Sequence, residues 1–176
     1  NERIAEHVNA LLAIPDAELL FGGQPLEGHS IPECYGAYEA TAVQVPLHAV
    51  AGEHFALATT ELFGPFQVVV EYSDDELDAV LEIMERISHH LTAAVVSADA
   101  DFQQRVLGAT VNGTSYCGMR ARTTGAPQNH WFGPCGDPRA AGIGTPEAIV
   151  STWSGHREII MDQGPLPDGW DVPQSS

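Results

Sequence analysis

The chain has 176 residues, enough for one domain of ordinary size or for a large part of a bigger protein. Its 24 acidic residues outnumber its 7 basic residues, all of them arginine, so the formal net charge is −17 at pH 7. Such a chain repels phosphate and anionic lipid, and its apolar runs are too short to cross a bilayer. We therefore expect no nucleic-acid partner and no membrane insertion.

The first 46 residues predict a helix followed by two short strands. Apolar residues at positions 4, 8, 11 and 12 share one helical face, and the helix is expected to stop at Ile14-Pro15-Asp16. Residues 17–21 read as a strand, and a loop rich in glycine and proline follows. Val43 and Val45 indicate a second strand, which Pro46 ends.

The clearest pattern lies between residues 66 and 112. The β-branched run from Phe66 to Tyr72 predicts a strand covered on both faces, and Ser73-Asp74-Asp75-Glu76 has the form of a capping box. The helix that follows repeats apolar residues on one face. We then expect a strand at 92–97, a helix at 99–107 and a strand at 109–112. This alternation predicts an α/β fold with a parallel sheet and right-handed crossovers.

Beyond Asn112, a long glycine-rich segment without apolar periodicity reaches residue 144. Such a segment is more typical of a functional or interfacial loop than of a simple connection. Thr145-Pro146-Glu147 predicts a new helix, running to about Trp153. Residues 156–161 form a last strand-like segment.

Cysteines and histidines give no recognisable site. Cys34, Cys117 and Cys135 are too far apart for a disulfide framework or a C-x-x-C zinc knuckle, so we expect buried or half-buried free thiols. The eight histidines are scattered, and we expect no metal site. Gly142-Ile143-Gly144 lacks a preceding strand and is a weak dinucleotide motif. From these residues alone we expect an acidic intracellular α/β domain that is incomplete by itself.

Two stretches carry a resemblance to a known family. Glu61-Leu62-Phe63-Gly64-Pro65, just before the strand that starts at Phe66, resembles the E-x-F-G-P motif of the aldehyde dehydrogenase superfamily. The stretch Arg120 to Pro134 is similar to one branch of it, the plant-type 1-pyrroline-5-carboxylate (glutamate semialdehyde) dehydrogenases. Residues 30–32, 112–116, 142–149, 156–160 and 164–170 belong to the same resemblance, which covers essentially the whole chain.

The resemblance implies a chemistry and a place in the fold. In such enzymes a cysteine thiolate attacks the aldehyde, hydride passes to NAD⁺, and water hydrolyses the thioester. Residues 1–176 then correspond to the C-terminal portion of the catalytic domain, a parallel-sheet half with a long loop and a C-terminal oligomerisation-type strand. The nucleophile, the general base and the cofactor-binding domain lie upstream in the family. No catalytic residue is therefore expected in this chain, which should be inactive alone.

The resemblance also implies binding residues. Glu61 matches the glutamate that accepts hydrogen bonds from the nicotinamide ribose, and Phe63 matches the aromatic residue beside the nicotinamide ring. Gly125 and Ala126 match the loop whose backbone amides anchor the carboxylate of the substrate. Phe132 resembles the aromatic residue that flanks the aldehyde chain. The choice between NAD and NADP stays open, because the residues that contact the ribose phosphate lie outside this chain.

We therefore expect part of an NAD-dependent enzyme that oxidises glutamate semialdehyde to glutamate in proline breakdown. The late strand implies a homo-oligomer, and the compartment is the cytoplasm or the mitochondrial matrix. One alternative is a dehydrogenase for another acidic semialdehyde. The other is a truncated, non-catalytic oligomerisation module.

Overall fold

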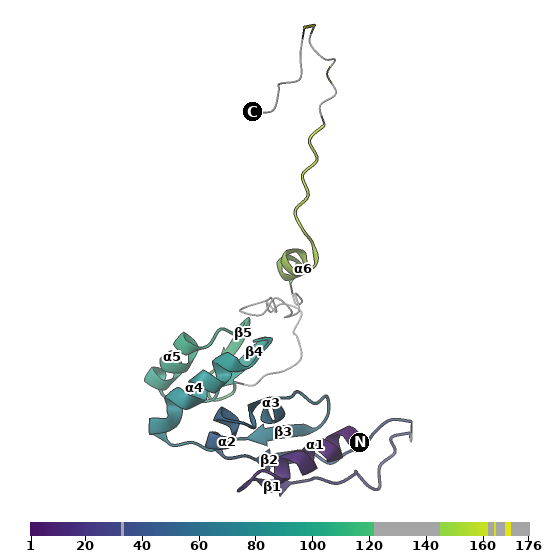
Figure 1. Ribbon diagram of the computed structural model, residues 1–176, viewed down its shortest axis with the longest axis vertical. Helices are drawn as coiled ribbons and strands as arrows, with labels where there is room; N and C mark the ends of the chain where they lie inside the picture. The colour runs from purple at the N-terminus through teal and green to yellow at the C-terminus, as the bar shows by residue number, and fades with distance from the viewer. Residues whose placement is uncertain (33, 122–144, 162–163, 165–167, 170–176) are drawn as a thin grey trace.

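The computed structural model describes residues 1–32, 34–121, 145–161, 164 and 168–169 (Figure 1). Within them the chain forms two small sheets with helices beside each. The elements are α1 (Glu2–Leu12), β1 (Glu18–Phe21), β2 (Thr41–Gln44), α2 (Leu47–Ala51), α3 (Phe55–Ala58), β3 (Phe66–Val69), the 3₁₀ turn η1 (Asp74–Glu76), α4 (Leu77–Arg86), β4 (Thr92–Val95), α5 (Ala100–Ala109), β5 (Thr114–Cys117) and α6 (Pro146–Trp153).

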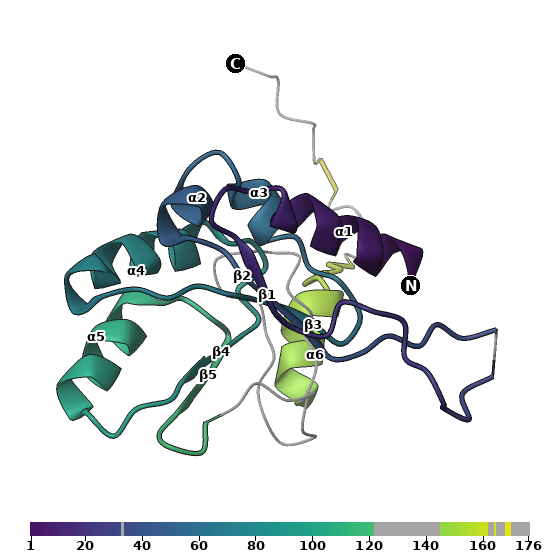
Figure 2. The same cartoon turned by 90° about the horizontal axis from the view of Figure 1, so that it is seen from below.

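The first sheet has the strand order β1-β2-β3. β1 runs antiparallel to β2, whereas β2 and β3 are parallel, with Thr41 opposite Phe66 and Gln44 opposite Val69. Figure 2 shows α1, α2 and α3 along one side of this sheet. The sheet is therefore mixed, and β2 is its central strand.

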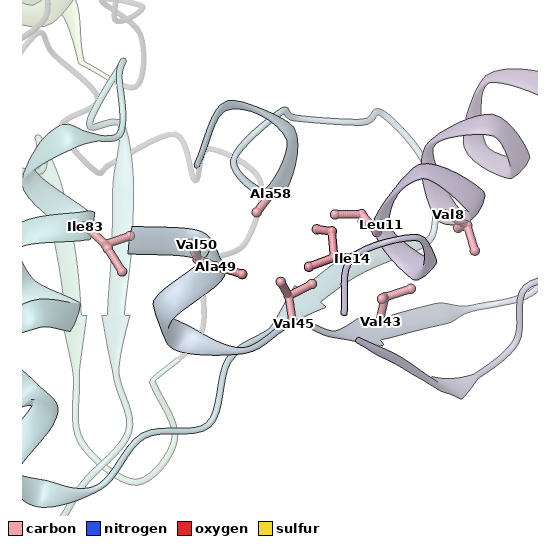
Figure 3. Close-up of a cluster of buried hydrophobic side chains, with 9 residues drawn as sticks. All are labelled: Val8, Leu11, Ile14, Val43, Val45, Ala49, Val50, Ala58 and Ile83. Carbon is pink, nitrogen blue, oxygen red and sulfur yellow. The ribbon is translucent and has the colours of Figure 1, made fainter. Parts of the chain in front are cut away.

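The main hydrophobic core lies between that sheet and its helices (Figure 3). The apolar face predicted for the first helix is the one that α1 buries, and Leu11 has no exposed surface. Val43 and Val45 are equally buried. The remaining buried members of the cluster are Val8, Ile14, Ala49, Val50, Ala58 and Ile83. Because β2 contributes side chains at the centre of this core, it fixes the positions of α1 and α2.

The second sheet consists of the parallel strands β4 and β5, with Thr92 opposite Thr114 and Val95 opposite Cys117. α4 and α5 cover it, and one residue from each of three elements forms its small core: Leu81, Val95 and Val106. α4 also buries Ile83 in the first core. A single helix is therefore packed against both halves of the described fold.

Two sequence predictions about the sheet are wrong. Within the described residues, β3 and β4 do not pair, so the expected single parallel sheet is two sheets, one of them mixed. The expected strand at 109–112 is also misplaced, because α5 continues to Ala109 and the pairing with β4 begins beyond Asn112. Thr110 and Val111 have strand-type side chains. The ladder, however, starts where the Gly113 amide donates to the His90 carbonyl, at 2.8 Å.

The predicted helix starts are confirmed. Ser73 and Glu76 form the capping box, and both the amide and the hydroxyl of Ser73 donate to Glu76 Oε2, at 2.8 and 2.6 Å. Asp99 caps α5 by accepting from the Phe102 amide at 2.9 Å. Thr145 caps α6 by accepting from the Ala148 amide at 3.2 Å. The caps at Ser73 and Thr145 were therefore readable from the sequence, and the structure adds the cap at Asp99.

The expected strand at 156–161 does not form in the single chain. Residues 154–161 have neither helical nor strand structure, and they extend away from α6 (Figure 1). A strand needs a neighbour for its backbone hydrogen bonds, and the described residues provide no ladder partner here. Ile159, Ile160 and Met161 remain 65%, 85% and 73% exposed.

Among the described residues, no helix has the length and hydropathy needed to span a bilayer.

Candidate functional site

The loop between α3 and β3, residues 59–65, carries Glu61 and Phe63 and is called here the α3–β3 loop. Hydrogen bonds fix its start to α3: the hydroxyl of Thr59 donates to the Phe55 carbonyl at 2.8 Å, and that of Thr60 donates to the Ala56 carbonyl at 2.6 Å. At its end, the Thr41 amide donates to the Pro65 carbonyl at 2.8 Å. Glu61 and Phe63 therefore lie on a short loop that is held at both ends.

α1 supports the end of this loop from the side. A Cβ atom added to Gly64 would lie 2.7 Å from Cδ1 of Ile4, so glycine allows α1 to approach closely. One turn further along α1, the His7 ring meets the ring of Phe66, with 5.6 Å between the ring centroids. Gly64 and Phe66 are thus packed against α1, which is itself anchored in the main core.

Glu61 and Phe63 themselves face outward. Phe63 is 95% exposed, and Glu61 is also exposed. In the described part of the chain, the Glu61 carboxylate has neither an ion-pair nor a hydrogen-bond partner. A carboxylate accepts hydrogen bonds without competing donors, and an aromatic ring so fully exposed is a natural contact for a flat ligand. The pair therefore fits a ligand with hydroxyl donors and a planar ring.

The predicted substrate-binding residues Gly125, Ala126 and Phe132 lie outside the described residues. Of the predicted site residues, the structure describes Glu61 and Phe63, two positions apart on one loop, and the geometry of the rest of the predicted site stays a prediction.

Two hollows open along α4, and the α3–β3 loop contributes to neither. One, of about 310 Å³, is lined mainly by Asp74, Asp75, Asp78 and Arg105. The other, of about 270 Å³, is an apolar hollow between α4, α5 and β4. Arg105 forms an ion pair with Asp78 at the first hollow.

Cys34 and Cys117 are free thiols, as predicted, but both are exposed, not buried. The described residues hold no group of three or more histidine, cysteine or acidic side chains that could bind a metal ion.

Sequence reasoning missed the residues that support the α3–β3 loop. Ile4 and His7 are three residues apart on α1, so their common face could have been read from helical periodicity. Arg86, which lies over the ring of Phe55 with 4.1 Å between its guanidinium carbon and the ring centroid, gave no such signal. The two residues are 31 positions apart, and only the fold brings them together.

No protein-family profile matches the chain. Two curated plant proteins are similar along 99% of it: a probable aldehyde dehydrogenase from Linum usitatissimum, 61% identical over 176 residues, and Delta-1-pyrroline-5-carboxylate dehydrogenase 12A1, mitochondrial, from Arabidopsis thaliana, 59% identical over 177 residues. In both cases the chain spans 32% of the length of the relative.

Solved structures agree with this match. Betaine aldehyde dehydrogenase from Staphylococcus aureus covers 98% of the chain with a TM-score of 0.64 at 18% identity, and the chain covers 32% of it. Proline utilization A from Bradyrhizobium japonicum covers 66% with a TM-score of 0.51 at 27% identity, and the chain covers 10% of it. Together with the identities to the plant proteins, this places the chain in the aldehyde dehydrogenase superfamily, as about a third of the length of its curated relatives.

Proposed function

We propose that the protein containing this chain oxidises 1-pyrroline-5-carboxylate, through its open form glutamate semialdehyde, to glutamate, with NAD⁺ as the oxidant. The observation that carries this proposal is the 59% identity, along 99% of the chain, to a plant protein named for that substrate. A solved enzyme named for a different aldehyde is less similar. A gamma-glutamyl-gamma-aminobutyraldehyde dehydrogenase from Burkholderia cenocepacia is 25% identical over 75% of the chain.

Glu61 and Phe63 are proposed as the coenzyme contacts of this chain. The Glu61 carboxylate would accept hydrogen bonds from the two ribose hydroxyls next to the nicotinamide, and the Phe63 ring would lie beside the nicotinamide. Their exposure on a loop held at both ends supports this assignment. NAD⁺ supplies the hydride acceptor when it is bound. The family uses NAD or NADP, and the Staphylococcus aureus relative was solved with NAD⁺.

Gly125, Ala126 and Phe132 are proposed to bind the substrate. Backbone amides at Gly125 and Ala126 would hold the carboxylate of the semialdehyde, and Phe132 would flank its carbon chain. Replacing Gly125 with leucine in the complete protein should raise the KM for glutamate semialdehyde and leave the KM for NAD⁺ unchanged. An unchanged KM for the aldehyde would overturn the anchor assignment.

The catalytic nucleophile, the general base and the cofactor-binding domain are proposed to lie outside residues 1–176, so that this chain alone is inactive. The Arabidopsis relative is named as mitochondrial, and we extend this location to the present protein as part of the proposal.

The segment 156–161 is proposed as a strand that pairs with another subunit of a homo-oligomer. Ile159 and Ile160 are exposed, and the described residues form no ladder with this segment. Both observations support this role, because a second chain would cover the apolar side chains and pair with the backbone of the segment. Light scattering on the complete protein should show an oligomer at micromolar concentration. A monomer would contradict the proposal.

The direct experiment is to express the complete reading frame that encodes this chain and to follow NADH formation with 1-pyrroline-5-carboxylate. We expect a higher kcat/KM with this substrate than with succinic semialdehyde or betaine aldehyde. A preference for another semialdehyde would overturn the substrate assignment. A reading frame without further dehydrogenase sequence, and without activity, would instead favour a non-catalytic oligomerisation module.

A further inference from the structure

Arg86, the last residue of α4, bridges α2 and α3. Its Nη1 donates to the carbonyl of Ala51, the last residue of α2, at 2.7 Å. Its guanidinium carbon lies 4.1 Å from the centroid of the Phe55 ring, at the first residue of α3. One side chain thus contacts both ends of the turn that joins these two short helices. The cation also lies beside a helix C-terminal carbonyl, where positive charge is favoured.

α3 is too short to hold its position without such contacts. It has four residues, Phe55–Ala58, and isolated helices of that length are unstable in water. Ala58 is buried in the main core, and Phe55 packs against it from its edge. The guanidinium group covers the ring of Phe55, so it holds the start of α3 against α4.

The start of the α3–β3 loop is built directly on α3. The Phe55 carbonyl accepts from both the amide and the hydroxyl of Thr59, at 3.0 and 2.8 Å. Thr60 donates to the Ala56 carbonyl. Glu61 is the next residue. If Phe55 moves, its carbonyl moves with it, and the two hydrogen bonds from Thr59 then shift the residues that directly precede Glu61.

We propose that Arg86 is a positioning residue for the α3–β3 loop: by holding Phe55 and Ala51 it fixes α3, and through Thr59 and Thr60 it fixes the backbone that carries Glu61. The coenzyme part of this statement rests on the proposed role of Glu61. The structural part, that Arg86 orders residues 55–61, stands independently of that role.

The test compares Arg86→Met, which keeps the length of the side chain but removes the charge and the donors, with Arg86→Lys, which keeps a cation and a donor. Both are made in the complete protein. In Arg86→Met, amide hydrogen exchange in a peptide covering residues 55–61 should be about three- to tenfold faster, and the KM for NAD⁺ should rise about three- to tenfold. The values of kcat and of the KM for the aldehyde should stay within about twofold. Arg86→Lys should restore most of both effects.

Two further variants make the result specific. Arg105→Met removes a different arginine contact of α4, the ion pair between Arg105 and Asp78, and should change neither exchange in 55–61 nor the KM for NAD⁺. The double variant Phe55→Leu with Arg86→Met should change exchange in 55–61 and the KM for NAD⁺ no more than the stronger single variant does. Both substitutions remove the same contact between the guanidinium group and the ring.

Unchanged exchange in residues 55–61 of folded Arg86→Met would overturn the proposal. Glu61→Gln, measured in parallel, separates this failure from a failure of the proposed function. If Glu61→Gln leaves the KM for NAD⁺ unchanged while Arg86→Met still speeds exchange, the role of Glu61 is wrong and the structural role of Arg86 is supported. If Glu61→Gln raises that KM and Arg86→Met does not, Arg86 does not position Glu61 for the coenzyme.

Discussion

The ring of His7 stands edge-on against the ring of Phe66, with 5.6 Å between the ring centroids and an angle of 89° between the ring planes. Phe66 begins β3 directly after the α3–β3 loop, so this contact joins α1 to the end of the loop. His7 Nε2 is buried, and the described residues give it no hydrogen-bond partner. Burial, and secondarily the charge of Arg3, lower the pKa of His7 below its ordinary value of 6.5. The folded chain therefore favours the neutral imidazole.

This contact predicts a pH-dependent stability. The pKa of His7 is lower in the folded chain than the unfolded value of 6.5. The contribution of His7 to the free energy of unfolding is therefore fully present above pH 6.5. It is lost as the pH falls from 6.5 through the folded-state pKa. Between about pH 7.5 and about pH 5.5, the Tm of the unmodified protein should fall more than that of His7→Leu. Calorimetry on both proteins in the same buffers measures the difference, and equal falls in Tm would show that His7 does not contribute.

Phe63 predicts an effect on coenzyme use without an effect on stability. Its side chain is 95% exposed, so Phe63→Ala removes almost no packing and should change the free energy of unfolding by less than about 0.5 kcal/mol. If the ring lies beside the nicotinamide, kcat/KM for NAD⁺ should fall about tenfold. Tyr35→Ala, at another exposed aromatic residue, is the matched control and should leave the kinetics unchanged. Equal kinetics for the two variants would remove Phe63 from the coenzyme site.

The sequence predicted local structure better than it predicted pairing. The cap residues Ser73 and Thr145 were readable from the sequence, because a cap depends on residues within one turn of each other. The separation of β3 from β4 was not readable, because apolar strand patterns do not say which neighbour completes a ladder. Residues 156–161 form no strand in the single chain for a related reason, because a strand needs a partner for its backbone hydrogen bonds.

The same limit applies to the candidate site. Glu61 and Phe63 were found through a short motif, and the structure adds that the loop carrying them is held at both ends. The contacts with α3 are local, whereas those with α1 and with Thr41 of β2 join residues far apart in the chain. Gly64 illustrates this point: its place in the motif was visible, but the closeness of Ile4 behind it appears only in the fold.

The capping box at Ser73 and Glu76 predicts that the ionised Glu76 carboxylate stabilises the N-terminus of the η1–α4 segment. The hydrogen bonds from the Ser73 side chain and then from its backbone lower the pKa of Glu76 below 4.5. The contribution of Glu76 to the free energy of unfolding is therefore present above pH 4.5 and is lost as the pH falls through the folded-state pKa. Glu76→Gln should lower the Tm by ~2 °C at neutral pH, and the difference should shrink in acid. Glu82→Gln removes the same charge from the middle of α4 and should not show this pattern in thermal melts.

We predict that none of the three cysteines of this chain is the catalytic nucleophile. Cys34 and Cys117 are exposed free thiols, Cys117 at the end of β5, and Cys135 lies outside the described residues. None of them matches the nucleophile motif of the family, so the complete protein with all three replaced by serine should keep its kcat within about twofold. A thiol reagent such as iodoacetamide should still inactivate that variant, because the attacking thiolate lies elsewhere. A loss of about a hundredfold or more with unchanged Tm would place the nucleophile within this chain, and single replacements would then identify it.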